Sequence, residues 1–250
     1  MTDCVIAKAG GGRDDLVVVP DAQSLARAAA DWLLSAMRAR DGTAAVCLAG
    51  GATPRPLYAL LAEPLYRDRI PWQRVHWFWG DERFVPADDP RNNYRMAWLA
   101  LFQHAPVPPA NIHAIPTTGR IEEAAMAYEQ ALQDFYGATH LAAERPLFAA
   151  TLLGLGEDGH TASLFTGQAA LDEARHWTVA VPDAPGEPRI SLSYPALASS
   201  DAIAFLVSGA EKRAALSAIR SGGDVPAARV RPADRVTWFV DRAAAGEEIE

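Results

Sequence analysis

The sequence has little cysteine: Cys4 and Cys47 are the only two among its 250 residues. Two cysteines so far apart provide neither a disulfide framework nor the paired spacing of a zinc site. No cluster of histidines and acids has the spacing of metal ligands either. We therefore expect a protein that works without a metal and without a cofactor.

Long apolar runs are also missing, and none reaches the roughly 20 residues that a membrane-spanning helix needs. The first residues, Met1 to Cys4, show no basic, apolar and cleavable leader, so we expect a cytoplasmic protein. The formal net charge of −8 disfavours nucleic acid as a partner. It also disfavours an anionic ligand unless a local group of basic residues outweighs it. We expect a small-molecule ligand, no membrane partner, and a monomer or a weak homodimer.

Half of the residues are hydrophobic, and short apolar runs alternate with amphipathic segments along the chain. This alternation, without an internal repeat, predicts a Rossmann-like, doubly wound α/β fold with a mainly parallel sheet flanked by helices. We expect one domain over residues 1–250, with a small accessory β region around 177–200. The expected strands are 16–19, 43–48, 74–79, 112–115, 147–153, 202–207 and 236–240.

Gly50 and Gly51 follow the strand expected at 43–48. Thr53 is a residue type that caps helices, and Pro54 suits a first helical position. A helix that starts after a glycine turn is a ready site for an anion. No Gly-Lys-Ser/Thr follows, so the turn is not a nucleotide-binding P-loop. Taken alone, it can also be an ordinary connection between a strand and a helix.

Three charged residues, Asp81, Glu82 and Arg83, follow the strand expected at 74–79. Such a group is either a solvated turn or part of a site at the end of the strand. His76 lies within this strand, and we interpret it as a structural histidine.

The strand expected at 147–153 runs into three glycines in six residues, with Asp158 and His160 beside the last one. Ligands of open α/β sheets bind at the carboxyl ends of strands, so His160 is where we expect an acid/base catalyst. Thr161 or Ser163 is expected to help start a helix. A structural glycine turn with a surface histidine is the alternative interpretation.

The spacing of Gly154, Gly156 and Gly159 also matches the dinucleotide-binding fingerprint. Two features oppose that interpretation. Asp158 would face a pyrophosphate with like charge, and Thr166-Gly167 breaks the following run where the fingerprint needs a full crossover helix. We therefore expect no bound dinucleotide.

Lys212 is expected in the first turn of a helix over 210–220, where the helix dipole disfavours a cation. A phosphate bound at that end of the helix would reverse this preference. Arg189 opens another expected strand. Taken alone, both side chains can equally be solvated surface residues.

Five blocks of the sequence, in this order, resemble the 6-phosphogluconolactonases, which are relatives of the glucosamine-6-phosphate deaminases. The resemblance covers nearly the whole chain. Two departures, Asn92 where serine is frequent and Thr166 where proline is usual, concern loops beside the site. The run after His160 lacks the glutamate of the deaminases, which favours the lactonase. The blocks are 50–54, 79–83 followed by Asn93, 154–165, 189–192 and 208–212.

The resemblance implies hydrolysis of 6-phospho-D-glucono-1,5-lactone to 6-phospho-D-gluconate in the oxidative pentose phosphate pathway. His160 would take a proton from water and return it to the ring oxygen, while Asp158 and Asp81 orient the imidazole or balance charge. A deaminase-like sugar-phosphate isomerase and a non-catalytic sugar-phosphate sensor are the alternatives. The residues implied in phosphate binding are Gly50, Gly51, Thr53, Arg83, Arg189 and Lys212.

Overall fold

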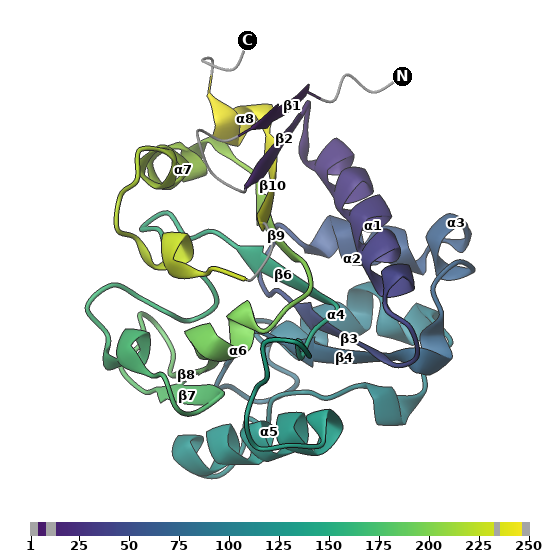
Figure 1. Cartoon of the computed structure of the whole chain (residues 1–250), viewed down its shortest axis with the longest axis vertical. Helices are drawn as coiled ribbons and strands as arrows, with labels where there is room; N and C mark the ends of the chain where they lie inside the picture. The colour runs from purple at the N-terminus through teal and green to yellow at the C-terminus, as the bar shows by residue number, and fades with distance from the viewer. Residues whose placement is uncertain (1–4, 9–13, 233–235, 247–250) are drawn as a thin grey trace.

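A computed structural model describes residues 5–8, 14–232 and 236–246 of the chain. Its main sheet has the strand order β1-β2-β10-β9-β6-β3-β4 and is flanked by helices (Figure 1). β1 is antiparallel to β2, and the other pairs of the sheet are parallel, which confirms the predicted α/β class. The strands are β1 (Val5–Lys8), β2 (Asp15–Val19), β10 (Val236–Asp241), β9 (Ile203–Val207), β6 (Ala150–Gly154), β3 (Ala44–Leu48) and β4 (Val75–Trp79).

The helices connect these strands, and the first of them shows why the local sequence folds as it does. The side chain of Asp21 caps α1 by accepting a hydrogen bond from the Ser24 N–H at 2.7 Å. Leu25, Ala29 and Leu33 follow at helical spacing and are buried. The α-helices are α1 (Ala22–Ala39), α2 (Arg55–Ala62), α3 (Pro64–Arg67), α4 (Asn93–Ala100), α5 (Ile121–Tyr136), α6 (Tyr194–Ala198), α7 (Arg213–Arg220) and α8 (Arg242–Ala245).

A second, antiparallel sheet contains β5 (Asp81–Arg83), β8 (Arg189–Leu192) and β7 (Thr178–Val181). The accessory β region expected around 177–200 is therefore confirmed. It also includes β5, which the sequence left open as a turn or part of a site. Since Asp81 pairs with Ser191 and Arg83 with Arg189, two arginines distant in the sequence occupy facing positions.

Two expectations about local structure are wrong. The strand expected at 112–115 is a single bridge between Ile112 and Trp77, because prolines at 109 and 116 leave too short a segment. No helix begins at Thr161 or Ser163, because Ala162 adopts a positive φ of 48° that a right-handed helix does not allow. Among the described residues, no helix is long and apolar enough to cross a membrane.

Candidate active site

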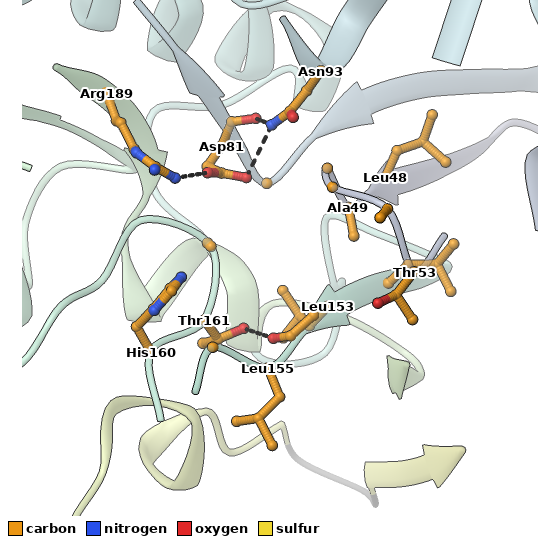
Figure 2. Close-up of a pocket in the computed structure, with 18 of the residues that line it drawn as sticks. Leu48, Ala49, Thr53, Asp81, Asn93, Leu153, Leu155, His160, Thr161 and Arg189 are labelled. Atoms are coloured by element: carbon orange, nitrogen blue, oxygen red, sulfur yellow. Dashed lines mark hydrogen bonds and ion pairs between the residues drawn. The ribbon is translucent and has the colours of Figure 1, made fainter. Parts of the chain in front are cut away.

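The segments that follow β3, β4, β6 and β9 meet around one cavity at the carboxyl edge of the main sheet (Figure 2). Ligands of parallel sheets bind at such an edge. Asp158 lies just outside the cavity wall. The other residues that the sequence placed at the site all line it: Gly50, Gly51, Thr53, Asp81, Arg83, His160, Arg189 and Lys212.

His160 is held by the carboxylate of Asp158, whose Oδ1 lies 2.5 Å from the ring Nδ1 and 3.1 Å from the His160 backbone nitrogen. Burial raises the pKa of Asp158, but the hydrogen bonds from His160 outweigh it and leave the pKa below its ordinary value. An ionised carboxylate only accepts, so Nδ1 carries the hydrogen and Nε2 is the nitrogen that can take up a proton.

The loop that carries this pair depends on two of its glycines. A Cβ at Gly156 would lie 2.0 Å from the His160 Nδ1, and one at Gly159 would lie 2.7 Å from Val225. Gly159 also has a φ of 83°, in the region that favours glycine. The imidazole packs on Phe165 with ring centroids 4.4 Å apart. Gly156 therefore leaves room for the imidazole, and Gly159 allows the loop to pack against Val225.

Asp81 is 6% exposed and makes a different set of contacts. Its Oδ2 accepts a hydrogen bond from the Ser163 hydroxyl at 2.6 Å and lies 3.9 Å from the Arg189 Nη1. Asn93 donates to its backbone oxygen at 3.0 Å and to Oδ1 at 3.4 Å (Figure 2). The sequence left open which carboxylate contacts the imidazole. Among the described residues Asp158 makes that hydrogen bond, while Asp81 faces a cation.

The Gly50 turn packs directly against Asn93, since a Cβ at Gly50 would lie 2.1 Å from the Asn93 Oδ1. In the part of the chain that the structure describes, the N–H groups of Gly51, Ala52 and Thr53 donate no hydrogen bond. The expectation that Thr53 caps the next helix is wrong. Pro54 occupies that position in an αR conformation, and no side chain caps α2. The turn therefore presents free donors at the edge of the cavity.

Two arginines and a lysine supply positive charge to the same cavity. Arg83 donates from Nη1 to the Arg91 carbonyl oxygen at 2.9 Å, yet its buried Nε has no partner, and the same holds for the Arg189 Nε. Burial lowers the pKa of Arg189, although nearby Asp81 acts in the opposite direction. Both guanidinium groups carry a positive charge at the cavity wall, so these two side chains are suited to an anion.

Lys212 lines the cavity too, and within the described ranges its side chain makes no hydrogen bond or ion pair. The sequence placed it in the first turn of a helix over 210–220. It is instead the last residue of a 3₁₀ turn, Ala210–Lys212, directly before α7. The positive φ of 102° at Gly209 starts this tighter turn before the α-helix begins.

Two contributors to the site were missed. Ser163 was interpreted only as a possible helix start, because its partner Asp81 is 82 residues away in the sequence. Asn93 lies in one of the sequence blocks that carry the resemblance, but the sequence alone indicates no role for it. A polar residue at the start of a helix, after a loop of charged residues, is the signal that was available for Asn93.

Comparisons with known proteins give a consistent result. The family model described as glucosamine-6-phosphate isomerases/6-phosphogluconolactonase matches residues 20–238. A 6-phosphogluconolactonase from Nostoc sp. is 37% identical over 240 residues, which cover 93% of this chain and 97% of that protein. The crystal structure of 6-phosphogluconolactonase from Thermotoga maritima has a TM-score of 0.78 and 31% identity, covering 90% of this chain and 98% of that one. A monomeric glucosamine-6-phosphate deaminase, with a TM-score of 0.76 but 23% identity, shares the fold.

Proposed function

Because the chain belongs to the family of glucosamine-6-phosphate isomerases and 6-phosphogluconolactonases, we propose that it hydrolyses 6-phospho-D-glucono-1,5-lactone to 6-phospho-D-gluconate. This reaction is a step of the oxidative pentose phosphate pathway. One observation carries the proposal: an imidazole oriented by an ionised carboxylate lines the same cavity as two arginines and a lysine. That arrangement suits an ester that carries a phosphate.

His160 is the general base in this reaction. Asp158 accepts from Nδ1–H, so Nε2 takes a proton from water as the water attacks the lactone carbonyl. Asp158 then stabilises the imidazolium that forms. His160 returns the proton to the ring oxygen when the tetrahedral intermediate collapses, and the ring opens to a carboxylic acid, which then releases its proton to solvent and becomes the carboxylate. Asp81 balances the charge of Arg189 in this scheme.

Arg83, Arg189 and Lys212 bind the phosphate, together with the turn of Gly50, Gly51 and Thr53. A phosphate dianion entering an acidic protein needs several donors, and charge-assisted hydrogen bonds are the strong ones. All three side chains line the same cavity, and this supports the assignment. A sensor of sugar phosphates would need the same donors, but it would have no use for the Asp158–His160 pair.

Substitution of the three basic residues tests this proposal. Each charge-assisted contact contributes roughly 1.5–3 kcal/mol, so Arg83→Ala, Arg189→Ala or Lys212→Ala should each lower kcat/KM for the phosphorylated lactone about ten- to a hundredfold. The weak hydrolysis of unphosphorylated gluconolactone should barely change, since that substrate has no dianion. Freshly generated lactone and subtraction of the uncatalysed reaction are needed. Equal losses on both substrates would contradict the phosphate role.

We also propose one domain over residues 1–250 that works in the cytoplasm as a monomer or a weak homodimer, with no nucleic-acid or membrane partner. The buried hydrophobic residues of the described chain form one cluster, which supports a single domain. Cys47 is a buried free thiol, as suits a reducing compartment. Sedimentation at micromolar concentration tests the oligomeric state, and a stable larger assembly would contradict the proposal.

A further inference from the structure

Asp241 ends β10 with a carboxylate that is almost fully buried, at 4% exposure. β10 runs parallel to β9 with Val240 opposite Val207, so Asp241 falls level with Ser208, the first residue after β9. The Ser208 hydroxyl donates to Oδ2 at 2.5 Å, and the Gly209 N–H donates to the carboxylate with both oxygens 3.2 Å away. Asp241 at the end of β10 therefore fixes the turn that follows β9 through hydrogen bonds.

One further hydrogen bond connects this turn to Lys212, whose N–H donates to the Gly209 carbonyl oxygen at 3.1 Å. Gly209 has a φ of 102°, in a region that residues with a side chain rarely adopt. The turn thus tolerates little change at this residue. The N–H of Gly209 donates to Asp241, and the carbonyl oxygen of Gly209 accepts from the Lys212 N–H. Two consecutive hydrogen bonds therefore connect the buried carboxylate to the backbone of the lysine at the cavity.

The same carboxylate also caps α8, because its Oδ1 accepts a hydrogen bond from the Ala244 N–H at 2.8 Å. α8 packs against α7 and against the 3₁₀ turn that ends at Lys212 (Figure 1). A helix of four residues needs only the cap. The additional bonds to Ser208 and Gly209 extend the influence of Asp241 toward the cavity.

We propose that Asp241 is a positioning residue that sets the backbone from which Lys212 reaches the phosphate. The inference rests on the proposed function, in which Lys212 binds that phosphate. Within the described residues the Lys212 side chain makes no hydrogen bond or ion pair, so the turn that holds its backbone is what limits where the ammonium group can reach. Asp241 touches neither His160 nor Asp158 in the described structure. Its loss should weaken phosphate binding and leave the chemistry at the imidazole unchanged.

Asp241→Asn is the first variant to measure, since an amide keeps the shape but replaces one acceptor oxygen with a donor group. KM for the phosphorylated lactone should rise about three- to tenfold, with kcat within about twofold of wild type. Hydrolysis of unphosphorylated gluconolactone should not change. In a Lys212→Ala background, Asp241→Asn should cause little further loss, because the residue that it positions is gone.

Asp21→Asn is the matched control, because Asp21 also caps a helix but lies away from the cavity. It should leave KM unchanged. If thermal unfolding shows that Asp241→Asn does not fold, Ser208→Ala removes one of the same hydrogen bonds and should also raise KM, by a smaller factor.

Three outcomes would each overturn the positioning role: full additivity in the double mutant, a loss of kcat on both substrates, or an unchanged KM. Lys212→Ala without a selective loss on the phosphorylated substrate would instead contradict the phosphate role of Lys212 itself.

Discussion

Two histidine environments in this molecule differ in the partner that each imidazole meets. His160 lines the cavity, with 26% of its side chain exposed, and donates to the ionised Asp158. At β4, His76 and His113 meet each other, with His76 Nδ1 2.9 Å from His113 Nε2. His113 also stacks on Phe78 with ring centroids 4.3 Å apart and planes at 4°.

The difference shows how the surroundings decide what a histidine can do. A carboxylate stabilises the positive charge that an imidazole acquires when it takes a proton. The rings that His113 contacts, those of His76 and Phe78, carry no negative charge that would do the same. Burial, followed by the effect of His76, lowers the pKa of His113 to about 4, and burial lowers the pKa of His76 as well. We propose that the first region serves proton transfer, whereas the second is a packing element, as the position of His76 within a strand suggested.

The largest expected effect is a loss of kcat on substitution of His160 that substitution of His113 does not cause. His160→Ala should lower kcat by about 10²- to 10⁴-fold with a smaller change in KM, because the general base is lost. His113→Gln should leave kcat within about twofold, since its imidazole bonds to His76, packs on Phe78 and does not line the cavity. Steady-state kinetics of both variants with the phosphorylated lactone as substrate would measure kcat and KM. Near-wild-type kcat in His160→Ala would remove the proposed mechanism.

A smaller effect is expected at the partner of His160. In Asp158→Asn the amide oxygen can still accept from Nδ1–H, but the imidazole loses the negative charge that stabilises its protonated form, and the amide NH2 can compete as a donor and fix the tautomer less firmly. Because Asp158 is 57% exposed, water can partly replace it. We therefore expect kcat to fall about ten- to a hundredfold, less than for His160→Ala.

The neighbouring Glu157 provides the control for this substitution. It is exposed in the same loop, and no hydrogen bond of the described residues uses its side chain. Glu157→Gln removes the same amount of negative charge and should leave kcat unchanged. If both variants lost activity equally, the general charge of the loop would matter, and the hydrogen bond to the imidazole would not.

The sequence predicted most of what depends on neighbouring residues. Buried strands are recognisable in the sequence as apolar runs. Most of the expected site residues follow the ends of parallel strands, so the main sheet brings them together, whereas Arg189 opens β8 of the second sheet. The sequence did not predict which partner each of these residues contacts in the folded structure. The choice of Asp158 over Asp81 for His160, the pairing of β5 with β8, and the Ser163–Asp81 hydrogen bond all depend on contacts between distant segments. The helix expected after His160 failed because one residue, Ala162, adopts a positive φ.

The smallest expected effect concerns acid stability at the His76–His113 pair. The pKa of His113 in the folded protein, about 4, lies below the ordinary value of 6.5. The folded state thus favours the neutral ring, and the stability that this provides is present above pH 6.5 and is lost as the pH falls toward 4.

His113→Gln should remove this dependence, because glutamine does not titrate. Wild type should lose about 1–2 kcal/mol more unfolding free energy than the variant between pH 7 and pH 4.5, a figure reduced because the pair is only half-buried. Urea unfolding at both pH values measures it, with His140→Gln, an exposed histidine, as the control that should follow wild type. Since the two rings interact, the transition belongs to the pair, and His76→Gln should remove part of it too. Parallel pH profiles for wild type and His113→Gln would mean that protonation of this pair costs the fold nothing, and the contrast with His160 would then rest on activity alone.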